Sequence, residues 1–121
     1  MNCGFPESQH NNTAISICRC FAGEANFEWA GGLALGGGEA ISGRPLLKVK
    51  GMARNVIKSL ELAAIGLAAG KSIPAEAIDL MAKPLIPGRL YTIIGNVGWR
   101  RRAKKHNAHK CLKDRPYVAE K

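Results

Sequence analysis

Two short segments of this chain carry residues that could contact a ligand at close range. The first is Gly4-Phe5-Pro6-Glu7-Ser8, in which the Glu7 carboxylate could accept and the Ser8 hydroxyl could donate a hydrogen bond. The second is Gly36-Gly37-Gly38, part of a cluster of six glycines between Gly31 and Gly43. Because glycine has no Cβ, its backbone can come close to another group. The segments therefore predict either a backbone-lined binding edge or a tight structural turn, with Ser8 capping the next helix.

Other site chemistries fit the sequence less well. His106, His109 and Cys111 could each ligate a metal, but their spacing matches no recurrent zinc pattern and the surrounding segment is basic. The run from Gly38 to Gly43 is followed by Arg44-Pro45, where a phosphate-binding loop needs Lys and then Ser or Thr. We therefore predict no metal site and no nucleotide-binding loop of that kind, and we identify no catalytic residue.

Charge is distributed unevenly along the 121 residues. Residues 1–43 contain four acids and one base, whereas residues 44–121 contain 17 bases and five acids. A dense basic cluster near the C-terminal end could bind an anionic surface, either a membrane or a nucleic acid, or could simply be solvated. Its members are Arg100, Arg101, Arg102, Lys104 and Lys105.

The four cysteines do not form a disulfide framework. Cys18 and Cys20 are separated by one residue on a predicted helix, and Cys3 and Cys111 stand alone. The N-terminal residues show no secretory signal, and no apolar run is long enough to span a bilayer. Together these features predict reduced thiols and a cytoplasmic protein.

The pattern of apolar residues predicts about four helices and one strand. The helices are expected at residues 12–25, 52–69, 74–81 and 89–106, the last interrupted or bent near Gly95 and Gly98. The apolar stripe of the second comprises Met52, Val56, Leu60, Ala63 and Leu67, and Gly70 is expected to end it. Residues 27–35 are short, mostly apolar and bounded by glycines, which predicts a buried strand. Residues 107–121 are expected to form a basic tail without a fixed fold.

Three blocks of the sequence resemble the C-terminal half of flavodoxin-like NAD(P)H-dependent FMN reductases. They are Asn2-Cys3-Gly4-Phe5-Pro6-Glu7-Ser8, the segment from Phe27 through Gly38 to Leu46, and the segment from Ile73 to Pro87. The resemblance covers residues 1–118 as a partial domain. It implies an α/β fold, the C-terminal half of a doubly wound sheet, which is mostly helical as it stands.

The resemblance also implies a cofactor and a reductant. FMN would lie at the carboxyl edge of the sheet, and the loops at residues 4–8 and 36–46 would converge on its isoalloxazine ring. NAD(P)H would supply the hydride. Gly4, Phe5, Pro6, Glu7, Ser8, Gly36, Gly37 and Gly38 are the cofactor-contacting residues that the resemblance implies.

The sequence departs from the family because the phosphate-binding loop after the first strand has no counterpart. We therefore expect weak or absent FMN binding by this chain alone, with a missing N-terminal half or a second copy completing it. The alternatives are a small basic protein that binds a membrane surface or nucleic acid, and a non-functional truncated remnant.

Overall fold

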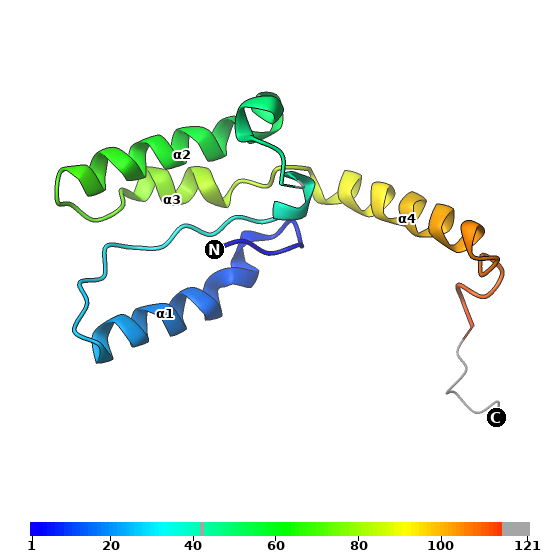
Figure 1. The fold of residues 1–121 in the computed structure, drawn as a ribbon, viewed down its shortest axis with the longest axis horizontal. Helices are drawn as coiled ribbons and strands as arrows, with labels where there is room; N and C mark the ends of the chain where they lie inside the picture. Colours follow the sequence, from blue (N-terminus) through cyan, green and yellow to red (C-terminus); the bar gives the residue numbers. More distant parts are fainter. Residues whose placement is uncertain (42, 115–121) are drawn as a thin grey trace. The chain divides into compact units, whose positions relative to one another are not determined.

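A computed structural model describes residues 1–41 and 43–114 of the chain. In these residues the chain forms four α-helices and three short 3₁₀ turns (Figure 1). The α-helices are α1 (Asn12–Glu24), α2 (Lys50–Ala68), α3 (Ala75–Ala82) and α4 (Gly88–Lys105), and the 3₁₀ turns are η1 (Ser8–Asn11), η2 (Gly38–Ile41) and η3 (Leu46–Val49). Contacts divide the chain into two compact units, Met1–Gly88 and a second one that begins at Arg89. The four predicted helices are thus confirmed.

Three of the helices end in the same backbone motif. Asn26, Gly70 and Asn107 follow α1, α2 and α4 with left-handed φ values of 56°, 66° and 55°. At each end the next residue donates its N–H back five residues, as in the 2.9 Å bond from Lys71 to the Gly66 carbonyl. These are Schellman motifs, which favour glycine and asparagine in the left-handed position. The predicted helix end at Gly70 is confirmed.

The first unit has three layers. An extended segment, residues 27–35, runs between α1 on one side and α2 with α3 on the other (Figure 1). Its glycines allow this close passage: a Cβ at Gly32 would lie 3.0 Å from Ile15 of α1, and one at Gly31 would lie 3.0 Å from Ile73. The buried core joins this segment to the helix pair through Leu35, Ala53, Val56 and Met81.

Helices α2 and α3 pack through small side chains. Ala53, Ser59, Ala63 and Gly66 are buried on α2, and the Ser59 hydroxyl donates to the Ala77 carbonyl of α3 at 2.6 Å. The predicted stripe is therefore only partly right: Val56 and Ala63 are buried, whereas Met52, Leu60 and Leu67 are 37–47% exposed. Small residues let the backbones approach, and Val56 of α2 and Met81 of α3 are the larger apolar side chains buried in the same cluster.

The predicted α/β fold is wrong for this chain. No β-strand is assigned within residues 1–41 and 43–114, and the expected strand at 27–35 makes only one isolated parallel bridge, between Asn2 and Leu35. Isolated strands are not stable, because a ladder needs neighbouring strands to satisfy its backbone and bury its faces. The residues around Asn2 supply one rung and no more. The doubly wound half-sheet is consequently absent from the part of the chain that the structure describes.

The described part of the second unit consists of α4, apart from its first residue, and the turns that follow it. Helix α4 is continuous from Gly88 to Lys105, so the predicted interruption near Gly95 and Gly98 is not seen. Residues 107–114, expected to be an unfolded tail, form hydrogen-bonded turns that include Cys111 N–H to Ala108 and Asp114 N–H to Cys111, both at 3.1 Å. The remainder of that predicted tail, 115–121, lies outside the described residues.

Candidate functional site

The two segments singled out by the sequence lie against each other. The Cys3 N–H donates to the Leu35 carbonyl at 3.1 Å, and the Leu35 N–H donates to Met1 at 3.0 Å. Beyond this bridge the Gly37 N–H donates to the Phe5 carbonyl at 2.6 Å and the Gly38 N–H to the Cys3 carbonyl at 3.0 Å. We call the two segments, residues 3–8 and 36–38, the loop pair. Backbone bonds between residues more than 30 positions apart hold it together.

The glycines of the second loop serve this contact. A Cβ at Gly36 would overlap the Pro6 carbonyl oxygen and lie 2.9 Å from the Ser8 nitrogen. Gly37 has φ of 68°, a left-handed conformation that side-chain-bearing residues rarely adopt. A Cβ at Gly38 would lie 3.0 Å from the Asn2 side chain. Gly36 and Gly37 are buried, so the close approach that they permit is to the first loop itself.

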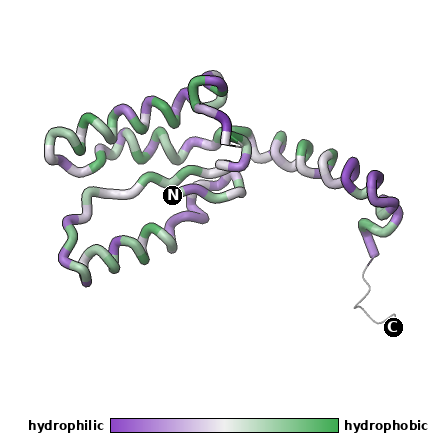
Figure 2. Tube along the Cα trace, viewed as in Figure 1, coloured by the Kyte–Doolittle hydropathy of each residue, from purple (hydrophilic) through white to green (hydrophobic). Residues whose placement is uncertain are grey.

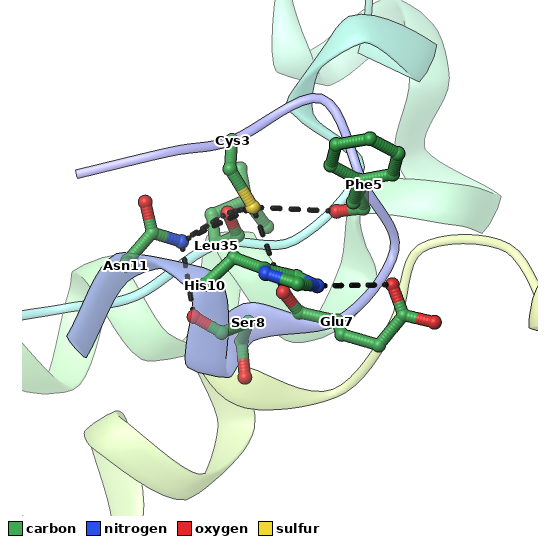
Figure 3. A network of polar contacts seen from close by, with 7 residues as sticks. All are labelled: Cys3, Phe5, Glu7, Ser8, His10, Asn11 and Leu35. Carbon is green, nitrogen blue, oxygen red and sulfur yellow. Dashed lines mark hydrogen bonds and ion pairs between the residues drawn. The ribbon is translucent and has the colours of Figure 1, made fainter. Parts of the chain in front are cut away.

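The Asn11 side chain ties the first loop to Leu35, the residue just before the second loop (Figure 3). Its amide Nδ2 donates to the Leu35 carbonyl at 3.0 Å and to the Ser8 carbonyl at 3.1 Å, and it contacts the Cys3 Sγ at 3.4 Å. The Asn11 residue is only 3% exposed. These bonds fix the position of the Asn11 side chain, because leaving its buried amide N–H groups without acceptors would be costly.

The outer face of the loop pair presents an aromatic ring and a polar pair. Phe5 is 61% exposed, and its ring centroid lies 5.5 Å from that of His10 at a tilt of 44°. The His10 Nε2 lies 3.8 Å from the Glu7 Oε2. Gly4 is also exposed, and Ser8 is half-buried. This face combines an apolar ring with a group that can accept hydrogen bonds and one that can donate them.

Sequence reasoning did not select Cys3 and Asn11 as organising residues. An asparagine directly before a helix usually caps it, but here the Asn11 side chain makes no cap bond to α1. Nor does Ser8 form a side-chain cap: the residue before η1 is Glu7, and no cap bond is made there. Nothing local distinguishes a capping asparagine from one that reaches a carbonyl 24 residues away.

The predicted basic cluster lies on the C-terminal half of α4. All five residues of the cluster are exposed. Along its length, α4 changes from apolar to hydrophilic (Figure 2). Among the described helices, none combines the length and apolar character needed to cross a bilayer.

The histidines and the cysteine near this cluster do not form a metal site. In residues 1–41 and 43–114 no group of three or more His, Cys, Asp or Glu side chains is placed to hold an ion. Cys111 instead interacts with Asp114, whose carboxylate accepts its hydrogen bond and raises the pKa of the Cys111 thiol, with the negative charge adding to the effect.

Comparisons with protein-family models, with curated proteins and with solved structures find no match to this chain.

Proposed function

We propose that this chain supplies the ring-side loops of an FMN-dependent oxidoreductase that takes hydride from NAD(P)H. The observation that carries the proposal is the loop pair: the two segments assigned to the flavin by the sequence resemblance lie in direct backbone contact. The ligand-accessible part is the face with Gly4, Phe5, Glu7 and Ser8, because Gly36 and Gly37 are buried in the contact.

This face suits an isoalloxazine ring. The exposed Phe5 ring offers a flat apolar surface. The isoalloxazine ring could pack against it offset or edge-on, the arrangements that aromatic pairs favour. The Glu7 carboxylate can accept a hydrogen bond from a ring N–H, and the Ser8 hydroxyl can donate one to a ring carbonyl. Hydride transfer itself belongs to the cofactors, so the protein's task is to bind and orient them.

The same proposal calls for a second body, either a complementary segment or another copy of the chain. In the Asn2–Leu35 bridge the bonds run through the Met1 carbonyl and the Cys3 N–H, so the backbone groups of Asn2 point to the opposite edge. Backbone N–H and C=O groups that face outward can pair with another extended segment. Leu60, Ile65 and Leu67 on α2 are also exposed, which leaves apolar surface to cover.

Riboflavin titration followed by amide chemical shifts tests the ring-side role. Riboflavin has no phosphate, so its binding does not depend on the basic residues of α4. We expect weak binding that shifts the amides of Gly4, Phe5, Glu7 and Ser8, and we expect Gly36→Ala to abolish these shifts while Gly23→Ala preserves them. Shifts confined to other residues, or none at the solubility limit of riboflavin, would refute the proposal.

A second candidate function is binding to an anionic surface through α4. Between Asp79 and Asp114 the sequence contains no acid and nine Lys or Arg residues. A positive field without internal neutralisation attracts polyanions and weakens with added salt. Binding to anionic vesicles or oligonucleotides that does not fall as salt rises would contradict this role.

A further inference from the structure

The C-terminal end of α4 and the turns that follow it form a basic hollow of about 550 Å³ that is open to solvent. We call it the basic hollow. It is lined by Arg100, Lys104, His109, Lys110, Leu112 and Lys113. No carboxylate is among these lining residues, and none of them forms a salt bridge with a residue that the structure describes.

The Schellman motif explains why these residues meet. The Ala108 N–H donates to the Ala103 carbonyl at 2.8 Å and the Asn107 N–H to Lys104 at 3.2 Å, with Asn107 in the left-handed conformation. This motif reverses the chain at the end of α4, so that residues 109–113 fold back beside the last turns of the helix. Two segments of the same sign of charge are thereby held together.

The basic hollow continues an apolar row on α4. Ile93, Val97, Arg100 and Lys104 are spaced by four, three and four residues, which places them on one face of a helix. Ile93 is 59% and Val97 is 42% exposed, and Leu90 and Ile94 beside them are 47% and 54% exposed. One face of α4 is therefore apolar in its first half and basic in its second.

We propose that this face binds a membrane containing acidic phospholipid, with a lipid phosphomonoester in the basic hollow and the apolar row in the interfacial region. A phosphomonoester carries close to two negative charges and three acceptor oxygens, which suits several converging cations. Nucleic acid would use the cations but leave the apolar row without a role. The inference rests on the proposed anionic-surface role of α4 and is independent of the flavin proposal.

Co-sedimentation of the full chain with vesicles tests the lipid assignment. The vesicles are pure phosphatidylcholine, or phosphatidylcholine with phosphatidic acid or phosphatidylserine at matched surface charge. We expect tightest binding to phosphatidic acid. Lys104→Gln should weaken it about fivefold, the worth of one basic residue at an anionic membrane. Arg102→Gln, which removes the same charge from the opposite side of α4, should weaken it less than about twofold, because Arg102 does not line the basic hollow.

Ile93→Ser separates membrane binding from capture of a free anion. It should reduce vesicle binding about tenfold through lost apolar burial. It should leave unchanged the amide shifts that inorganic phosphate causes at His109, Lys110 and Lys113. Because Ile93 and Lys104 are exposed, both variants should keep the wild-type circular dichroism.

Three results would overturn the inference in distinguishable ways. Equal effects of Lys104→Gln and Arg102→Gln would show diffuse charge attraction. The anionic-surface role would then stand, but the basic hollow would not be a binding site. Oligonucleotide binding as tight as vesicle binding, with Ile93→Ser neutral, would assign the face to nucleic acid. Absence of binding to every anionic probe would refute both the lipid inference and the role on which it rests.

Discussion

The loop pair and the basic hollow are built in opposite ways. In the loop pair, Cys3 meets Gly38 and Phe5 meets Gly37, so each contact closes a long segment of the chain. In the basic hollow, all the lining residues lie between Arg100 and Lys113 and depend on one helix end. Closing long loops costs conformational entropy that local structure does not require. The first site should therefore be lost with the tertiary structure, and the second should persist as long as α4 and its C-terminal turn remain.

The largest expected effect is that of Gly36→Ala. Its Cβ would overlap the Pro6 carbonyl oxygen in a contact made only of backbone, which cannot move aside as a flexible side chain can. We expect a loss of about 3 kcal/mol in the free energy of unfolding of the first unit. Urea unfolding followed by Trp29 fluorescence, in a Trp99→Phe background, measures it.

The matched control for this substitution is Gly23→Ala. Gly23 lies in α1, and a methyl group on its Cα would have nothing within 4 Å, so alanine should be neutral or slightly stabilising there. Neither variant should change the amide shifts of residues 107–113. Equal loss of stability in the two variants, or a change in the amide shifts of the basic hollow, would contradict the difference proposed between the two regions.

The next effect is that of Asn11→Ala. Removing the amide deletes its hydrogen bonds to the Leu35 and Ser8 carbonyls, and the loss of two bonds should cost about 2 kcal/mol. Hydrogen exchange at Cys3 and Leu35 should become faster, because these two amides donate the backbone bonds beside the Asn11 contact to Leu35. Asn12→Ala, at an exposed position one residue later, should leave both exchange rates unaltered.

A smaller, local effect is expected at Asn107. Alanine tolerates the left-handed conformation poorly, so Asn107→Ala should fray the last turn of α4 at a cost of about 1 kcal/mol. Asn107→Gly should preserve or strengthen the turn. Amide shifts of residues 103–113 report the change, and Trp29 unfolding should be the same in both variants. A shift of the urea unfolding transition reported by Trp29 would mean that the second unit does not depend on local interactions alone.

The smallest effect concerns thiol reactivity. The Asp114 carboxylate raises the pKa of the Cys111 thiol, so less of the reactive thiolate is present near neutral pH. Asp114→Asn should lower that pKa and speed alkylation of Cys111 several times, with the rate profile displaced toward lower pH. Peptide mass spectrometry after iodoacetamide pulses at several pH values measures it. An unchanged profile of alkylation rate against pH would contradict the hydrogen bond between Cys111 and Asp114.

The sequence by itself determined the local structure of this protein. Helical spacing located α1 to α4 within a few residues, and Gly70 predicted one helix end, because both depend on neighbouring residues and on backbone conformation alone. The resemblance also directed attention to residues 3–8 and 36–38, which the structure brings together. It did not reveal that Gly36 and Gly37 would be buried by that contact.

Only the tertiary structure decided those features that depend on contacts between residues far apart in the sequence. The apolar run at 27–35 has strand composition, yet without neighbouring strands it remains an extended segment between helices. The face that α2 buries is set by close approach to α3 and to the residues before it, which favours Ser59 and Gly66 over the larger Leu60 and Leu67. Asn11 became the organiser of the loop pair because a carbonyl 24 residues away lies within hydrogen-bond distance of its amide. Local energies favour each helix, but only packing determines which of its faces is buried.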